Sequence, residues 1–267
     1  MNDDLRLARR AVSAGAAVGL RHFAALSGLS REHKADGTVV TAADRDVEAA
    51  IREVIGAERP DDAILGEEGG LSGSGSRRWI IDPIDGTGLF VAGDDRWLVL
   101  LALAEDGEIT TAVAAVPAQA MTWWAARGAG AFEALDDGPT RRIAVAGLAV
   151  GGVAGGLAVG GVAAGGGLAT CRVSITDTNP AVGAPLAAVV RALPWDVHPA
   201  LLVARGDLDL GLQTAGQVWD FAATSLIVQE AGGVYRRLDG GAGVAAGPAV
   251  YARDEQLATA ALAVLNG

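Results

Sequence analysis

The sequence is poor in several kinds of residue, and each shortage excludes a class of protein. Cys171 is the single cysteine among 267 residues, which excludes an intramolecular disulfide framework and a cysteine-based metal cluster. One cysteine also fits a reducing compartment, and the expected location is the cytoplasm. The three histidines, His22, His33 and His198, lack the spacing of a metal site. No Walker A and no nucleophile-elbow sequence is present.

Basic residues are outnumbered by acidic ones. The chain has 21 Lys and Arg against 32 Asp and Glu, a formal net charge of −11. Nucleic-acid backbones are bound by clustered Lys and Arg, so no nucleic-acid partner is expected. A small phosphate ester remains compatible with this charge, because a bound divalent cation reverses the local field. Hydrophobic residues make up 51% of the chain, enough for one large domain or two small, tightly joined ones.

One long uncharged segment, 143–169, has the hydropathy of a membrane span. Gly147, Gly151 and Gly155 recur in it at the spacing of a helix-packing motif. Ten of its residues are glycine, which weakens a helix. A single span would also separate acidic motifs that lie on both sides of it. The segment is therefore expected to form glycine-rich strand and loops within a soluble fold, and the acidic, interrupted amino terminus is not expected to be a secretion signal.

Hydrophobic periodicity predicts the main helices and strands. Apolar residues at helical spacing predict an amphipathic helix over 3–26, and the run from Thr41 to Asp44 has the character of a capping box that starts a second helix. A Ser/Gly-rich loop is expected at 69–76. Apolar runs predict strands at 79–81, 97–104, 109–116 and 121–126, and periodic segments predict helices at 221–231 and 255–265.

The strongest local motif is Asp82-Pro83-Ile84-Asp85-Gly86-Thr87, which follows an apolar strand. Pro83 fixes the backbone between the two carboxylates, and Gly86 permits a tight bend. Hard cations such as Mg²⁺ require oxygen ligands, which the two aspartates and the Ile84 carbonyl can supply. A helix starting after Gly86 would offer N–H groups to a phosphate. An Asx-turn with a helix cap is the structural alternative for this segment.

Two further acidic motifs flank it at a distance. Glu67 and Glu68 follow an apolar run and precede Gly69, where adjacent acids are often merely solvated. Asp220 lies in Trp219-Asp220-Phe221 at the expected start of a helix, where it could simply be an N-cap.

Taken together, these motifs resemble the metal-binding signature of the inositol monophosphatase superfamily. The match consists of four elements in order, over roughly residues 5–265: Lys34 with Thr41-x-x-Asp44, Gly66-Glu67-Glu68, Asp82 to Thr87, and Trp219-Asp220 followed by Ala231-Gly232-Gly233. The resemblance implies the α/β fold of this group, a layered αβαβα sandwich of the inositol monophosphatase and fructose-1,6-bisphosphatase type. It places most metal ligands in an amino-terminal α+β part, 1–142, and Asp220 with the substrate pocket in a carboxy-terminal α/β part, 143–267.

The resemblance also implies a Mg²⁺-dependent phosphomonoesterase. Its metal ligands would be Glu67, Asp82, the Ile84 carbonyl, Asp85 and Asp220, for two Mg²⁺ ions and, through Glu68 and water, a weaker third. Asp44 and Thr87 would orient the attacking water, and with Glu68 they form the catalytic set. The phosphate would contact the N–H groups of Gly86, Thr87 and Gly88. Attack would be in line, without a phosphoenzyme.

The resemblance implies that the substrate is a small phosphorylated metabolite. Phe90-Val91-x-Gly93 before Trp97, and the segment 123–132, most resemble the histidinol-phosphate phosphatases of the group. Other positions depart from the usual pattern: Gly88-Leu89 follows Thr87, Pro194-Trp195-Asp196 replaces a glycine-led segment, and Gln213 replaces a glutamate. Trp195, Asp196 and Gln213, together with Asp85 and Asp220, are expected to line the substrate.

Three functions therefore remain in competition. Besides histidinol phosphate, the altered pocket suits an inositol, cyclitol, sugar or nucleoside monophosphate of specialised metabolism. An inactive binding or regulatory protein on the same fold is the alternative of another class; its mark would be the loss of a metal carboxylate, and none is lost. Relatives are usually dimers, so a homodimer is expected, and no membrane partner is.

Overall fold

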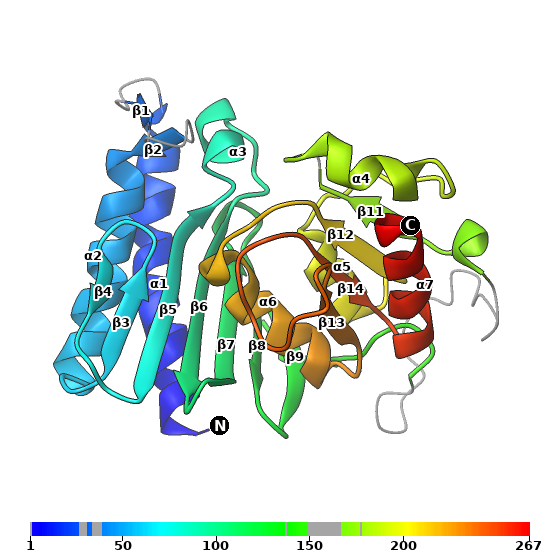
Figure 1. The fold of residues 1–267 in the computed structure, drawn as a ribbon. Helices are drawn as coiled ribbons and strands as arrows, with labels where there is room; N and C mark the ends of the chain where they lie inside the picture. The colour runs from blue at the N-terminus through cyan, green and yellow to red at the C-terminus, as the bar shows by residue number, and fades with distance from the viewer. Residues whose placement is uncertain (1, 27–30, 34–38, 137, 149–166, 177) are drawn as a thin grey trace.

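Two sheets and three layers of helices alternate through the molecule (Figure 1). The computed structural model describes residues 2–26, 31–33, 39–136, 138–148, 167–176 and 178–267. Lys34 of the first motif lies outside these residues. The order of layers is helices, large sheet, helices, small sheet, helices, so the predicted αβαβα sandwich is confirmed. Each layer buries an apolar face against the next, as layered domains require.

The first layer consists of α1 (Asp3–Phe23) and α2 (Ala42–Glu58). Asn2 caps α1, and the predicted capping box at Thr41 and Asp44 starts α2. The two helices lie very close together: a Cβ at Gly15 would lie 2.8 Å from Ile51. The apolar stripes of both helices pack on one face of the large sheet and form a first core with Trp79, Phe90 and Trp97.

The large sheet has the strand order β10-β9-β8-β7-β6-β5-β3-β4. Most neighbours are antiparallel, and β3 and β5 are parallel. Its strands are β3 Ala63–Gly66, β4 Gly70–Ser72, β5 Arg77–Asp85, β6 Leu98–Glu105, β7 Glu108–Val116, β8 Met121–Ala126, β9 Gly130–Leu135 and β10 Arg141–Ile143. Strands β5 and β6 are apolar on both faces because helices cover the sheet on both sides.

One local prediction at this sheet was wrong. Residues 69–76 were expected to form a loop, but β4 pairs with β3 in register Gly66 to Gly70. The strand is short and exposed at the sheet edge, so it lacks the apolar alternation by which strands are recognised. The remaining predicted strands and helices are confirmed to within a few residues. A small hairpin, β1 (Arg31–His33) and β2 (Val39–Thr41), precedes α2.

The middle layer lies between the two sheets and holds α5 (Pro199–Arg205) and α6 (Val218–Glu230). Helix α6 is buried continuously from Phe221 to Val228 because it is covered on all sides. The small sheet follows, in the order β11-β12-β14-β13. Its strands are β11 Val173–Ile175, β12 Leu210–Gln213, β13 Val234–Arg237 and β14 Ala249–Ala252, and α4 Pro180–Ala187 and α7 Glu255–Asn266 cover its outer face.

Two sequence-based expectations concern the middle of the chain. Residues 149–166 of the apolar segment lie outside the described residues, so the prediction for 143–169 stays a prediction. Within the described ranges, none of the helices has both the length and the apolar character of a membrane span. The division at 142/143 also stays a prediction, although all strands of the large sheet end by Ile143 and those of the small sheet begin at Val173.

Ion pairs of one buried carboxylate, Asp209, link three strands of the small sheet at their ends. Arg172 directly precedes β11, Asp209 precedes β12, and Arg253 follows β14. Asp209 is fully buried just before β12 and contacts Arg172 at 3.1 Å and Arg253 at 2.8 Å. Burial alone would raise the pKa of Asp209, but the hydrogen bonds and charge of Arg172, with the charge of Arg253, outweigh it and lower the pKa. The charged form of Asp209 therefore stabilises the folded state.

We expect Asp209→Asn to lower the free energy of unfolding by about 3 kcal/mol at neutral pH, because it removes the buried charge with which both Arg172 and Arg253 pair. The loss should be full above the unfolded Asp pKa of about 3.9, and it should shrink as the pH falls through the lower, folded value. Urea unfolding at several pH values measures both. Asp207→Asn, which removes only an exposed pair with Arg205, is the control and should cost under about 1 kcal/mol; equal losses in the two variants would contradict the prediction.

Candidate functional site

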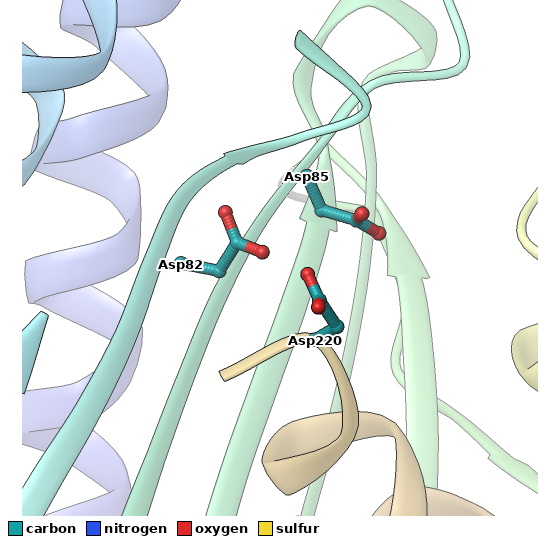
Figure 2. Close-up of side chains that lie close together, drawn as sticks. All are labelled: Asp82, Asp85 and Asp220. Atoms are coloured by element: carbon teal, nitrogen blue, oxygen red, sulfur yellow. The ribbon is translucent and has the colours of Figure 1, made fainter. Parts of the chain in front are cut away.

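Three carboxylates converge where β5 ends and α6 begins. Asp82 and Asp85 come from β5 and Asp220 from the first turn of α6, and Figure 2 shows their side chains pointing toward one another. Each offers an oxygen atom that lies within 4.8 Å of those of the other two. Residues more than 130 positions apart in sequence thus form one cluster of acceptors.

A β-bulge explains why two aspartates three positions apart face the same side. Side chains alternate along a regular strand, so positions i and i+3 would point to opposite faces. Here Asp82 pairs with Leu100 and Asp85 with Leu98, so three steps on β5 match two on β6. The extra residue in the bulge restores a common direction. Pro83 lies inside it and has no N–H to lose from the ladder.

Asp220 is fixed by the start of α6. The sequence left open that it is the N-cap; that alternative is wrong, because Gln217 is the N-cap and Asp220 is the third helical residue. The Asp220 carboxylate accepts a hydrogen bond from the Gln217 backbone N–H, as in a capping box. A Cβ at Gly216 would lie 2.9 Å from Asp220 Oδ2, so the turn closes tightly on this carboxylate.

The negative charges of the cluster repel one another. Burial, and then the charges of Glu67, Asp220 and Asp85, raise the pKa of Asp82 well above its usual range. Burial, Asp220 and Glu67 raise the pKa of Asp85 in the same way. Among the described residues, neither oxygen of Asp82 has a hydrogen-bond donor, although both are buried. Buried oxygens of this kind require a positive partner or a proton.

A divalent cation fits this donor set. All the converging ligands are carboxylate oxygens, which are the ligands that Mg²⁺ prefers. A cation would satisfy the two buried oxygens of Asp82 and offset the repulsion that raises both pKa values. The residues present are therefore compatible with the magnesium site predicted from the sequence.

Glu67 lies close enough to raise the pKa of Asp82 and Asp85, but outside the set of oxygens that lie within 4.8 Å of one another. The turn that carries Glu67 and Glu68 is held from behind by Glu48 of α2. Glu48 is 2% exposed and accepts from the N–H groups of Glu68 at 2.7 Å and Gly69 at 2.9 Å. A Cβ at Gly66 would overlap the Glu48 carboxylate, so only glycine permits this approach.

The structure brings Asp44 and Thr87 together. The Thr87 hydroxyl lies 3.1 Å from Asp44 Oδ1 and 3.1 Å from the Ile84 carbonyl, and it can donate to either. The other oxygen of Asp44 accepts from the N–H and hydroxyl of Thr41. Asp44 is buried, and these hydrogen bonds fix both of its carboxylate oxygens. The pair lies directly beside the strand end that carries Asp82 and Asp85.

The backbone after Asp85 turns sharply into α3 (Thr87–Ala92). Gly86 has a φ of 84°, a left-handed conformation that favours glycine. The Phe90 N–H bonds the Gly86 carbonyl, which leaves the N–H groups of Thr87 and Gly88 in the first, unsatisfied turn. Gly88 is exposed, and a Cβ there would meet no atom within 4 Å.

Trp195 and Asp196 are held by two side chains of the amino-terminal part. The Arg96 guanidinium lies 4.3 Å from the centre of the Trp195 ring and donates to the Trp195 carbonyl at 2.9 Å. Asp94 fixes Arg96 with two hydrogen bonds of 2.8 and 2.7 Å. Gln119 donates to the Asp196 carbonyl at 2.7 Å. The Asp196 residue is exposed, and no cation among the described residues pairs with its carboxylate.

Gln213 ends β12 and is 6% exposed. Its Oε1 accepts from the Tyr251 hydroxyl at 3.2 Å, and its side chain also hydrogen-bonds His198. Gln213 is thus set deeper than Asp196.

Sequence reasoning missed Glu48 and Arg96. One signal was available for Glu48, which lies four residues after Asp44 and so shares a helix face with it. The sequence contains no such signal for Arg96, because its partner Trp195 is 99 positions away.

Comparison with known proteins shows one family throughout. The sequence model of the inositol monophosphatase family matches residues 3–166 and 168–266. A histidinol-phosphatase of Mycobacterium tuberculosis is 40% identical over 252 residues, covering 93% of each chain. A Streptomyces griseus protein named glucose-1-phosphate thymidylyltransferase is 35% identical over 266 residues, covering 95% of this chain and 93% of that one.

Solved structures agree. An IMPase of Thermotoga maritima superposes with a TM-score of 0.80 at 26% identity, over 99% of this chain and 97% of that one. An IMPase/NADP phosphatase complexed with Mg²⁺ and phosphate shares the fold, with a TM-score of 0.72 at 18% identity, over 94% and 91% of the two chains.

We expect Asp82→Asn to raise the melting temperature of the protein stripped of divalent cations. The folded pKa of Asp82 is raised, so its charged form opposes folding near neutral pH, and a neutral amide removes that repulsion. Each kcal/mol gained shifts the melting temperature by roughly 2–4 °C in a chain of this size. Adding Mg²⁺ should then stabilise the wild type but not the variant. Equal stabilisation of both by Mg²⁺, in a thermal-shift titration, would contradict the assignment of the site.

Proposed function

The chain belongs to the inositol monophosphatase family, and on that premise we propose that it is a Mg²⁺-dependent phosphomonoesterase acting on histidinol phosphate. The family consists of phosphatases, so the chain is a hydrolase of phosphoric monoesters. The observation that carries the metal dependence is the convergence of Asp82, Asp85 and Asp220, together with the two buried oxygens of Asp82, which have no hydrogen-bond donor among the residues that the structure describes. An inactive protein on the same fold would have no reason to retain so unfavourable a cluster.

The residues that would hold two or three Mg²⁺ ions are Glu67, Asp82, Asp85, Asp220 and the carbonyl of Ile84, with Glu68 acting through water. A bound Mg²⁺ supplies Lewis acidity: it lowers the pKa of a coordinated water and stabilises negative charge on the phosphoryl oxygens. The likeness in fold to a phosphatase solved with Mg²⁺ and phosphate supports this choice of ion.

Asp44 and Thr87 would orient the attacking water. When the Thr87 hydroxyl donates a hydrogen bond to Asp44 Oδ1 at 3.1 Å, the hydroxyl oxygen remains free to accept one. A water that donates to this acceptor is held with its own lone pair turned away, toward the phosphorus. The N–H groups of Gly86, Thr87 and Gly88 would position the phosphate.

Histidinol phosphate as the substrate is supported by the 40% identity to the Mycobacterium tuberculosis histidinol-phosphatase over nearly the full length of both chains. Its cationic amino group needs an acidic partner. Asp196 is exposed, and its carboxylate forms no ion pair with the residues that the structure describes. It belongs to a segment that Arg96 and Gln119 hold in place. Asp196 is therefore our candidate for the ammonium partner.

A neutral sugar or cyclitol phosphate is the second candidate. It is favoured by Gln213, which offers an amide where the family usually has a charged carboxylate. The Streptomyces griseus relative, named for glucose 1-phosphate, adds weight to a sugar phosphate. An inositol or nucleoside monophosphate would meet the same neutral side chain.

The deciding experiment is a phosphate-release screen over histidinol phosphate, inositol phosphates, sugar phosphates and nucleotides, with Mg²⁺ and with excess chelator. We expect histidinol phosphate to give the highest kcat/KM, and no substrate to react in chelator. Asp82→Asn should lower turnover at least about 100-fold, because it removes a ligand and a charge that balances the cations. Activity in chelator, or near-normal turnover of the variant, would overturn the proposal.

Gln213→Glu tests how substrate choice is set. The carboxylate can still accept from Tyr251, and it adds a negative charge for an ammonium; a charge-assisted bond is worth roughly 1.5–3 kcal/mol, or about 10- to 150-fold. We therefore expect kcat/KM to rise selectively on histidinol phosphate relative to a neutral sugar phosphate. An equal change on both substrates would show that Gln213 does not set the choice. Asp196→Asn, which removes the proposed ammonium partner, should shift the preference the opposite way.

Two further features remain proposals. The family resemblance favours a homodimer, which sedimentation equilibrium would test. The single cysteine favours the cytoplasm, which fractionation of expressing cells would test.

A further inference from the structure

A buried network of polar side chains lies behind the carboxylate cluster. Its centre is the hydroxyl of Tyr251 on β14, which donates to Gln213 Oε1 at 3.2 Å and lies 2.7 Å from the hydroxyl oxygen of Thr224. Because Tyr251 donates to Gln213, the Thr224 hydroxyl donates to Tyr251, and Thr224 lies on α6 one turn after Asp220. His198, at the start of α5, hydrogen-bonds Gln213. The network therefore joins the small sheet to the helix that carries Asp220.

All members of this network are buried and uncharged. Tyr251 and Thr224 are fully buried, and His198 is 5% exposed. Burial lowers the pKa of His198 to about 4, although the hydrogen bond with Gln213 opposes this. Burial, and then the neighbouring Tyr235, raise the pKa of Tyr251 well above its usual range, and the charges of Asp85 and Asp220 add to the rise. The phenol thus lies within the field of the carboxylates and stays neutral.

The first turn of α6 has a reason to need such support. Asp82, Asp85 and Asp220 repel one another, and β5 cannot yield because it is an inner strand of the large sheet. The repulsion would therefore displace the start of α6, which carries Asp220, more readily than β5. The Thr224 hydroxyl touches this turn and is itself held by the phenol of Tyr251, whose ring lies 5.5 Å from that of Tyr235 and 6.3 Å from that of His198.

We propose that Tyr251 is a positioning residue of the metal site, whose hydroxyl holds Thr224 and, through it, keeps Asp220 beside Asp82 and Asp85. The inference rests on the proposed metal dependence and goes beyond it. Tyr251 touches neither the metal nor the substrate. Its contribution is to keep the ligands assembled before the cation arrives, which is the role expected of groups that orient metal ligands.

The chain offers a matched control for this inference. Tyr235 lies beside Tyr251 and is almost as buried, but its hydroxyl has no hydrogen-bond partner among the described residues. Tyr251→Phe and Tyr235→Phe remove the same atom from the same aromatic cluster. Only the first removal takes away a hydrogen bond to α6 and Gln213.

The test is calorimetric titration of Mg²⁺ into the wild type and both variants, without substrate. We expect Tyr251→Phe to weaken Mg²⁺ binding about 3- to 10-fold, the value of one or two neutral hydrogen bonds, and Tyr235→Phe to leave it within about 2-fold. Turnover of Tyr251→Phe should fall at low Mg²⁺ and recover at high Mg²⁺. Thr224→Val should reproduce the Tyr251→Phe effect, and the double variant should add little to either single one.

The outcomes separate this inference from the function on which it rests. If the wild type binds no Mg²⁺, the proposed function fails. If the wild type binds Mg²⁺ and Tyr251→Phe binds equally well, or if both tyrosine variants lose affinity alike, the positioning role is overturned. If Tyr251→Phe does not fold, Thr224→Val on its own decides the matter, with normal Mg²⁺ affinity counting against the inference.

Discussion

The mutual repulsion of clustered carboxylates, of which Asp82 is fully enclosed, is the constraint on which this structure depends. Asp82, Asp85 and Asp220 share a space in which their oxygens lie within 4.8 Å of one another, and Glu67 adds its charge from nearby. An isolated chain would separate such groups or protonate them. The fold must therefore hold them together by rigid elements, and the instability of the cluster without a cation would favour cation binding in the proposed site. The cluster lowers the free energy of unfolding of the metal-free protein, and a cation that removes the repulsion would bind correspondingly more tightly.

Three different local features hold the carboxylates in place. The bulge in β5 turns Asp82 and Asp85 to the same side. A capping box fixes Asp220 on α6, and Glu48 holds the turn of Glu67 and Glu68 through two backbone N–H groups. These devices belong to separate layers of the sandwich, so the site exists only when the layers have packed. Catalysis and folding thus draw on the same contacts, as expected of a site built on rigid elements.

The sequence predicted the features that are encoded locally. The capping box at Thr41, the bend at Gly86 and the pair Asp82 and Asp85 follow from residues close together in the chain. The layered fold and the role of Asp220 were implied by the resemblance of four separated motifs to one family. Strand β4 was missed because an edge strand of three residues, two of them exposed, carries no apolar pattern. The contacts of Arg96 with Trp195 and of Tyr251 with Gln213 were out of reach for another reason. Each joins segments far apart in sequence, and only the packed structure sets their separation.

This difference explains why family membership can be recognised from sequence motifs, whereas the substrate depends on the packed structure. Metal ligation demands oxygen atoms at nearly fixed places, so it leaves a dense and recognisable pattern between Glu67 and Thr87. In the proposed function, substrate choice depends on side chains whose direction is set by distant partners. Gln213 is turned inward by Tyr251, whereas the Asp196 segment is held from outside by Arg96 and Gln119. In the proposed function, a change at Asp94 or Arg96 would therefore move the Asp196 segment without altering any residue proposed to meet the substrate, so proteins of one family can act on different esters.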